Sequence, residues 1–140
     1  MNKNIAVIDG MGGGIGLEIV TQLKKEFKDE INIIALGTNA VATDRMMQAK
    51  ADKGASGENA IRFSIKDVNY IIGPIGIIFP NGLMGEVTKE IAEIVTSSKA
   101  KKILIPVNHP NIKIAGLPSE GLNTFINQAI EELKKSITDS

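Results

Sequence analysis

The sequence contains no cysteine, and only one histidine and one tyrosine among its 140 residues. Without cysteine, neither disulfides nor thiolate metal sites are available, and nothing in the cysteine usage places the chain outside the cytosol. The 16 basic and 16 acidic residues cancel. A neutral chain has no overall attraction for nucleic acid or for an anionic membrane. We therefore expect no nucleic-acid partner and no metal site.

The sequence also lacks an uninterrupted membrane-spanning segment. Residues 68 to 85 carry no charge, but Pro74, Pro80 and several glycines interrupt them, and a membrane helix would lose backbone hydrogen bonds that lipid cannot replace. The apolar run at residues 5 to 8 is too short for a signal peptide. We expect a cytoplasmic protein without a membrane partner. The apolar loop at residues 77 to 79 favours a surface covered by a second subunit, which predicts a homodimer.

The length and the apolar pattern predict one domain over residues 1–140. Residues 4 to 8 indicate a buried strand, residues 15 to 28 a helix with apolar side chains at helical spacing, and residues 31 to 36 a second strand. This is the size of a right-handed crossover unit with parallel strands. Further helices are predicted over residues 39–50, capped by Thr38, over residues 88–98, capped by Thr88, and over residues 122–137. Further strands are predicted over residues 60–65, 69–72 and 102–107, with a short strand at residues 112–115.

One connection does not suit a parallel sheet. Residues 60 to 65 alternate apolar and polar side chains, as a half-exposed strand does, while residues 53 to 57 are typical of turns. Only three residues join that strand to the next, and a parallel crossover needs about a dozen. Either residues 60 to 65 pair antiparallel at an edge, or they form an extended loop. The predicted fold is α/β: a Rossmann-like three-layer domain with a mostly parallel sheet of about five strands and this candidate antiparallel edge strand.

The first turn of the predicted fold is rich in glycine: Asp9 to Gly16 contains five glycines in eight residues, between a strand and a helix. A helix N-terminus leaves backbone N–H groups unpaired and carries a partial positive charge, so it attracts anions. Gly10 and Gly12 would make the turn, Gly14 would permit close approach of a ligand, and Gly16 would let the helix pack on the strand.

Two features of this loop limit its interpretation. Asp9 would repel a phosphate if it pointed into the cradle, so we favour a role in which its carboxylate accepts loop N–H groups and holds the turn. No Lys-Ser or Lys-Thr follows Gly16, which excludes a nucleoside-triphosphate P-loop. The alternative for the whole loop is a glycine-rich strand-to-helix turn without a ligand.

The spacing Gly10-x-x-x-Gly14-x-Gly16 resembles the glycine-rich loop of short-chain dehydrogenases and reductases. The resemblance implies a dinucleotide-binding fold with the pyrophosphate beside Gly14 to Gly16, and NAD or NADP as the cofactor. The second strand ends in neutral Thr38 and Asn39 instead of an acid. These two could still bind a ribose by hydrogen bonds, whereas Asp44 and Arg45 lie too deep in the next helix.

The catalytic Tyr-x-x-x-Lys of that family is missing, because the sole tyrosine, Tyr70, is followed four residues later by Pro74. We therefore expect no hydride transfer by that mechanism, and the sequence leaves open whether any other reaction is catalysed. Four loops should meet at the carboxyl ends of the strands: 9–16, 37–39, 73–76 and 108–109. The candidate ligand-binding residues are Asp9, Gly10, Gly12, Gly13, Gly14, Ile15, Gly16, Thr38, Asn39, Gly73 and Pro74. His109 is either a general base, a ligand contact or a solvated loop residue, and loop carboxylates such as Glu58 and Glu86 are interpreted as turn and helix-start residues.

Taken whole, the chain resembles a group of small bacterial proteins classed as a domain of unknown function. The stretches that carry this resemblance are residues 12–16, 36–40, 57–61 and 73–77. Our leading hypothesis is a domain that binds a nucleotide or dinucleotide at residues 9–16. The alternatives are a non-catalytic regulatory or sensor module for a small anionic metabolite, and an assembly protein without a ligand.

Overall fold

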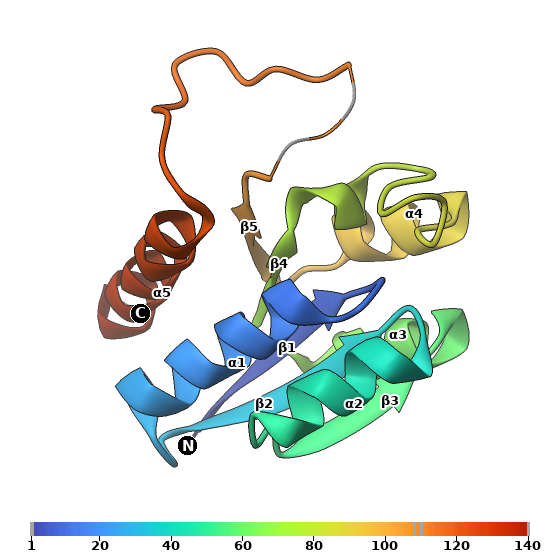
Figure 1. Ribbon diagram of the computed structural model, residues 1–140. Helices are drawn as coiled ribbons and strands as arrows, with labels where there is room; N and C mark the ends of the chain where they lie inside the picture. The colour runs from blue at the N-terminus through green and yellow to red at the C-terminus, as the bar shows by residue number, and fades with distance from the viewer. Residues whose placement is uncertain (1, 108, 110, 140) are drawn as a thin grey trace.

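Five parallel strands form the central sheet of the computed structural model, which describes residues 2–107, 109 and 111–139 (Figure 1). The strands are β1 (Lys3–Asp9), β2 (Ile31–Gly37), β3 (Lys53–Ser56), β4 (Tyr70–Pro74) and β5 (Lys101–Ile105). The α-helices are α1 (Gly14–Phe27), α2 (Ala40–Gln48), α3 (Glu58–Ser64), α4 (Lys89–Ser97) and α5 (Leu122–Asp139), and two short 3₁₀ helices are η1 (Ile65–Asp67) and η2 (Ile75–Ile78). The α/β class and the five-stranded sheet are as predicted.

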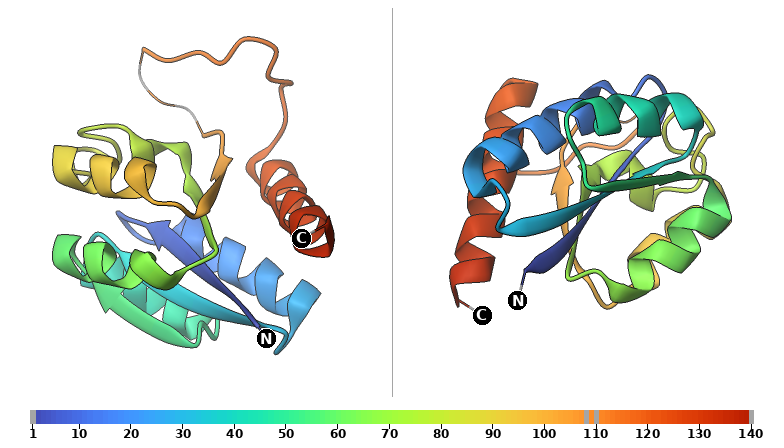
Figure 2. Two further views of the ribbon diagram at one scale, coloured as in Figure 1. Left: turned by 180° about the vertical axis from the view of Figure 1, so that it is seen from behind. Right: turned by 90° about the horizontal axis from the view of Figure 1, so that it is seen from below.

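Helices cover both faces of the sheet and make it a three-layer structure (Figure 2). Helices α1, α2 and α5 pack on one face through a core that includes Leu23, Met46 and Phe125. Helices α3 and α4 pack on the other face through a core that includes Ile61 and Ile91. Burial on both faces explains why β1 is apolar without alternation, as is typical of parallel strands.

The strand order is β3-β2-β1-β4-β5, so the chain reverses its direction of travel at β1. It runs outward from β1 through β2 to β3, and then returns through α3 to β4 on the other side of β1. The loops that follow β1 and β4 therefore leave the sheet toward opposite faces. In open parallel sheets, ligands bind beyond the carboxyl ends of the strands at such a reversal.

The prediction of a strand at residues 60 to 65 was wrong, and so was the antiparallel edge. These residues belong to α3 and η1, in which Ile61 and Ile65 are buried one helical turn apart while Phe63 is 73% exposed. The alternating pattern arose because Phe63 faces solvent. The third strand lies instead at residues 53 to 56, where we had predicted a turn. All pairings between strands are parallel, and α3 supplies the crossover that seemed to be missing.

The uncharged segment from residue 68 to residue 85 forms β4, η2 and a series of turns. Ile77 is fully buried in the core beneath α4, so its apolarity serves the domain itself, and the homodimer stays a prediction. Among the helices of the described residues, none combines the length and the apolarity needed to cross a bilayer.

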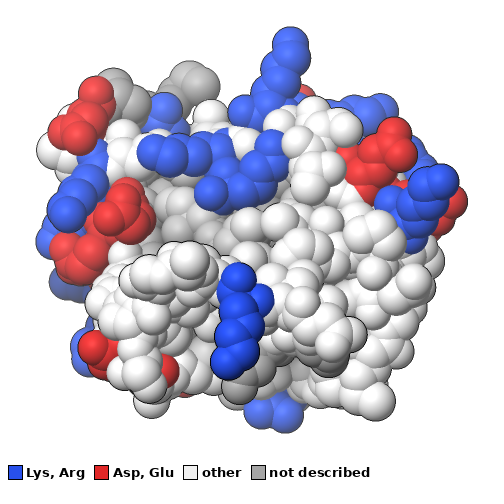
Figure 3. Space-filling model, turned by 90° about the horizontal axis from the view of Figure 1, so that it is seen from above, with Lys and Arg blue, Asp and Glu red and all other residues white. Residues whose placement is uncertain are grey.

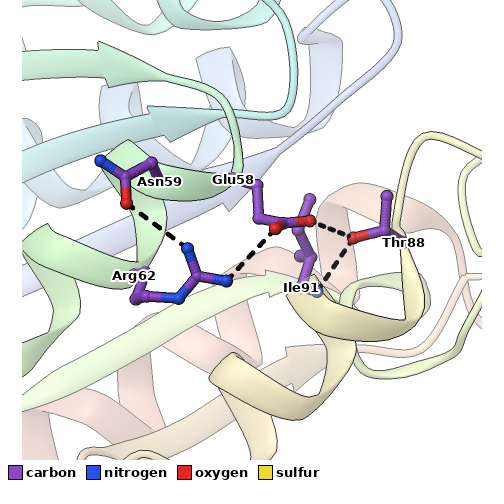
Figure 4. Close-up of polar contacts among 5 residues, drawn as sticks. All are labelled: Glu58, Asn59, Arg62, Thr88 and Ile91. Atoms are coloured by element: carbon purple, nitrogen blue, oxygen red, sulfur yellow. Dashed lines mark hydrogen bonds and ion pairs between the residues drawn. The ribbon is translucent and has the colours of Figure 1, made fainter.

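Helices α3 and α4 are joined by polar contacts at their N-terminal ends (Figure 4). Thr88 caps α4 as predicted, because its side chain accepts a hydrogen bond from the amide of Ile91 at 3.0 Å. Its hydroxyl donates to Glu58 at 2.8 Å, and Glu58 also pairs with Arg62 at 3.2 Å. Thr88 therefore caps its own helix and anchors the neighbouring one.

Residues 111–121, before α5, are exposed, and they arch away from the sheet (Figure 1). The short strand predicted at residues 112–115 is wrong: of the described residues here, His109 and Ile112 pair only in an isolated antiparallel bridge. The apolar stripe predicted for the last helix ran from Leu122 to Ile137. In α5, Leu122 is 40% exposed and Ile137 is partly buried, and the buried members are Phe125, Ile126, Ala129, Ile130 and Leu133.

Candidate functional site

The glycine loop connects β1 to α1 through a tight turn in which Gly13 is the N-cap residue. Gly13 has φ 76°, in the left-handed region that favours glycine, and its amide donates to the carbonyl of Gly10 at 2.9 Å. A Cβ on Gly13 would lie 2.7 Å from Cα of Ala42. The turn thus packs closely against α2.

The start of α1 is open to solvent. Gly13 provides no side-chain cap, and the amides of Gly14 and Ile15 have no acceptor among the described residues. Gly12 and Gly14 are exposed, and a Cβ on either would meet no other atom within 4 Å. Unpaired amides at a helix N-terminus with free space beside them are suited to an anion.

Asp9 holds the turn, as we had favoured. Its side chain is 3% exposed, and its Oδ2 atom accepts the amide of Gly16 at 2.6 Å. Burial raises the pKa of Asp9, hydrogen bonds from the amides of Gly16 and Gly10 oppose this increase, and the charge of Glu86 adds to it. Asp9 therefore occupies the third amide of the helix and leaves those of Gly14 and Ile15 unpaired.

Gly16 permits the close packing predicted for it, chiefly against α2. A Cβ at this position would lie 2.6 Å from the sulfur of Met46 and 3.0 Å from Cβ of Asp9. Contact at this distance is possible only without a side chain. Gly16 therefore has a structural role that does not depend on a ligand.

Thr38 and Asn39 both donate hydrogen bonds to the carboxylate of Glu86. Its Oε1 atom accepts from the Thr38 hydroxyl at 2.6 Å, from the Asn39 side-chain amide at 2.8 Å and from the backbone amide of Met11 at 2.9 Å. The hydrogen bond from Thr38 is the main reason why the pKa of Glu86 is lowered, and those from Met11 and Asn39 contribute to it.

This cluster was not predicted from the sequence. Glu86 was interpreted as a turn residue without a partner, yet Thr38 lies 48 residues away in the sequence and directly beside it in space. The cap of α2 was also predicted wrongly: Asn39, and not Thr38, accepts the amide of Ala42 at 2.9 Å. No local pattern indicates the contacts with Glu86, because they depend on where the loop before α4 lies.

Leu83 packs against the loops that follow β1 and β4. A Cβ added to Gly10 would lie 3.0 Å from Cδ1 of Leu83, and a Cβ added to Gly76 would lie 3.0 Å from Cδ2 of Leu83. Gly73 and Pro74, which we had proposed as ligand contacts, are buried in β4, and a Cβ on Gly73 would lie 2.3 Å from the carbonyl oxygen of Ile8. The structure gives these two residues a packing role, and their part in ligand binding stays a prediction.

Helix α2 brings the backbone of Arg45 close to the glycine turn. Cβ of Arg45 is 3.1 Å from the position that a Cβ on Gly13 would take. The residue is half-buried and belongs to none of the ion pairs between described residues. The expectation that Arg45 lies too deep in α2 to bind a ribose phosphate stays a prediction.

His109 packs edge-on against Phe79, with the ring centroids 4.8 Å apart. It lines a cavity of about 340 Å³ together with Ile75, Pro106 and Ile112. Asn108, which we had expected to contribute to the site, lies outside the described residues. A catalytic role for His109 stays a prediction.

The face seen in Figure 3 carries charges of both signs. Uncharged side chains cover most of it, and the acidic side chains in view lie toward its left and right margins. Within the described ranges, no group of three or more histidine and acidic side chains is arranged to hold a metal ion. Local donors, more than a general field, therefore determine what this edge of the sheet attracts.

The comparisons with known proteins give one family. Residues 4–138 match the model of a domain of unknown function, DUF3842. No curated protein matches the chain. Among solved structures, the chain is similar to a dodecameric FMN-dependent UbiX-like decarboxylase from Escherichia coli O157:H7, at 15% identity over 94% of this chain and 76% of that one, with a TM-score of 0.45. The chain therefore belongs to the DUF3842 family.

Proposed function

We propose that this domain binds the phosphate of a nucleotide or dinucleotide at the glycine loop. The observation that carries the proposal is the open start of α1, where the amides of Gly14 and Ile15 have no acceptor among the described residues and Gly12 and Gly14 leave space beside them. Helix N-termini with this arrangement bind phosphate through several hydrogen bonds at once. The amides of Gly14 and Ile15 lie next to the chain reversal, which is where nucleotides bind in open parallel sheets.

The charges near the loop bear on the same proposal. Asp9 is negative when ionised and would repel a phosphate, but its carboxylate faces the amide of Gly16 within the turn. Arg45 belongs to the last turn of α2, with its Cβ 3.1 Å from the position that a Cβ on Gly13 would take. A guanidinium binds phosphate through two parallel hydrogen bonds, so Arg45 would offset the repulsion from Asp9.

The proposal includes no reaction. The Tyr70 hydroxyl forms a hydrogen bond with Ser136 at 2.9 Å, and Tyr70 is at the amino end of β4, away from the carboxyl ends where the glycine loop lies. We therefore propose binding of a nucleotide, with NAD and NADP as the first candidates.

A second candidate is a non-catalytic module that holds a smaller anionic metabolite. The observation that favours it is Leu83, which packs against both Gly10 and Gly76. A small anion could lie on the amides without moving Leu83, whereas a dinucleotide that extends from the glycine loop across to Gly76 could not.

Thermal unfolding in the presence of NAD, NADP, ATP, FAD, inorganic phosphate and acetate distinguishes these candidates. A ligand at about 100 times its Kd stabilises the folded state by about 2.7 kcal/mol, which raises Tm by several degrees in a domain of this size. Nucleotide-selective stabilisation supports the first candidate. Stabilisation by phosphate or acetate alone supports the second, and no shift with any ligand contradicts both.

Gly14→Leu tests whether the glycine loop is the site. A Cβ there meets no atom within 4 Å, and leucine is a better helix former than glycine, so the unliganded variant should fold with an unchanged or higher Tm. The added side chain should abolish the nucleotide-induced shift. Thr21→Leu, at an exposed position on the same helix, is the matched control and should keep the shift. Normal binding by Gly14→Leu would remove the loop from the site.

A further inference from the structure

We infer that Glu86 is the ribose-recognition residue of this domain, and that its second carboxylate oxygen accepts hydrogen bonds from the 2′- and 3′-hydroxyls of a nucleotide bound at the glycine loop. The inference rests on the proposed nucleotide site and adds its specificity: a nucleotide with an unmodified ribose diol. Three sets of contacts carry it.

The first is the position of Glu86 relative to β2. In dinucleotide-binding sheets, an acidic residue at the end of the second strand binds the ribose hydroxyls. Strand β2 ends at Gly37 and is followed by neutral Thr38 and Asn39. Both of these side chains donate to Oε1 of Glu86, at 2.6 Å and 2.8 Å. A carboxylate from a distant part of the chain thus lies where the local sequence provides none.

The second is the position of Glu86 relative to the glycine loop. A Cβ on Gly10 would lie 3.0 Å from Oε1 of Glu86, and the amide of Met11 donates to the same oxygen at 2.9 Å. The carboxylate therefore lies between the loop that would hold the phosphate and the strand end that would hold the ribose. We propose that a ribose joined through its 5′-oxygen to a phosphate on this loop turns its 2′- and 3′-hydroxyls toward this carboxylate.

The third is the difference between the two carboxylate oxygens of Glu86. Oε1 accepts three hydrogen bonds, which fix the orientation of the group, whereas none of the described residues donates to Oε2. A carboxylate is an acceptor, so the partner that completes it must be a donor. Vicinal hydroxyls meet this requirement. A 2′-phosphate does not, because it brings negative charge against negative charge.

The loop that carries Glu86 is held in an unusual conformation. Asn81, Leu83 and Met84 have φ of 67°, 53° and 56°, a region that non-glycine residues seldom adopt. Hydrogen bonds between Asn81 and Val87 at 2.7 Å and between Val87 and Gly82 at 3.0 Å close the loop, and Val87 is fully buried. Backbone strain of this kind persists where surrounding structure enforces it, and it clusters at functional sites.

Isothermal titration with NAD and NADP tests the inference, with adenosine 5′-monophosphate and its 2′-deoxy analogue as a second pair. The wild type should prefer NAD to NADP, and the ribonucleotide to the deoxynucleotide. Glu86→Gln should weaken NAD binding roughly tenfold to a hundredfold, the range expected for a lost charged hydrogen bond, and should remove most of the discrimination against NADP. Glu90→Gln, at an exposed position on α4, should bind like the wild type.

A second variant separates charge from geometry. Glu86→Asp keeps the charge but shortens the side chain, so it should still reject NADP while it binds NAD more weakly. Circular dichroism of each variant checks that the fold is intact.

Several results would overturn the inference. Tighter NAD binding by Glu86→Gln would mean that Glu86 competes with ligands for Thr38 and Asn39, and unchanged binding would place the ribose elsewhere. Nucleotide binding that depends on Gly14 but ignores the ribose hydroxyls would refute the role of Glu86 and leave the proposed function standing. The absence of any binding that Gly14→Leu disrupts would refute both.

Discussion

The carboxylate of Asp9 accepts the amide of Gly16 at 2.6 Å, and this bond joins the end of β1 to the first turn of α1. The carboxylate is almost fully buried. Its hydrogen bond therefore stabilises the turn, whereas its burial disfavours the ionised form of the carboxyl group. The stability of the domain and the charge beside the proposed phosphate site both depend on this one side chain.

Asp9 should make stability fall as pH rises. Because burial raises the pKa of Asp9 above 3.8 in the folded state, the folded protein binds more protons than the unfolded chain between 3.8 and that raised pKa. The free energy of unfolding then decreases through this window and stays lower above it. Asp9→Asn should remove this decrease and still accept the amide of Gly16.

Urea denaturation of wild type and Asp9→Asn between about pH 4 and about pH 8 measures this effect. The lowered pKa of Glu86 gives stability that is present above 4.5 and lost as pH falls through its folded-state pKa, and both proteins contain this group. The difference in unfolding free energy between the two proteins therefore reports the titration of Asp9 together with its coupling to Glu86, whose charge raises the pKa of Asp9. Parallel stability curves would show that Asp9 has an ordinary pKa.

Gly16→Ala should destabilise the domain by about 1–3 kcal/mol, the range for overpacking a core. The added methyl group would meet the sulfur of Met46 at 2.6 Å and Cβ of Asp9 at 3.0 Å. Gly12→Ala is the control within the same loop, because a Cβ at Gly12 meets no atom within 4 Å; its effect should be within about 0.5 kcal/mol. Chemical denaturation measures both, and equal effects would contradict the packing proposed for Gly16.

Thr88→Ala should destabilise the domain by about 1 kcal/mol, because it removes the N-cap of α4. Thr88→Ser keeps the hydroxyl and should retain most of the stability. Glu58→Gln removes the charge of an exposed pair with Arg62 and leaves an oxygen that can still accept from Thr88, so it should change stability less than Thr88→Ala does. Thr88→Ala removes both the cap and the hydrogen bond to Glu58 (Figure 4), so a larger effect of Glu58→Gln would contradict the importance of Thr88 at this junction.

Tyr70→Phe should destabilise the domain by about 1 kcal/mol, because the buried Tyr70 hydroxyl loses its hydrogen bond to Ser136 on α5. Ser136→Ala removes the same bond from the other side. A double-mutant cycle should give a combined effect smaller than the sum of the two single effects, since both delete one interaction. Strict additivity would show that this bond does not secure α5 to β4.

Some parts of the fold and of the site are determined by the local sequence. The unit β1-α1-β2, the cap of α4 and most of the apolar stripe of α5 were predicted correctly. Helices α1 and α5 each bury one face whose apolar residues recur at helical spacing, and β1 is a short apolar run buried on both faces of the sheet. The same holds for the glycine loop. A glycine in the first turn of α1 permits close packing, and Gly16 packs closely against Met46. Asp9 accepts the amide of Gly16, which is only seven residues away in the sequence.

Only the tertiary structure decided the rest. Strand β3 is mostly exposed at the sheet edge, so its pairing with β2, and not an apolar pattern, makes it a strand. Phe63 points to solvent from α3 and produced a false alternation. Arg45 and Glu86 reach the glycine loop and the end of β2 because helix packing and the loop before α4 bring them there. Contacts between distant segments leave no periodic trace in the sequence, since the energy that stabilises them arises only after the chain has folded.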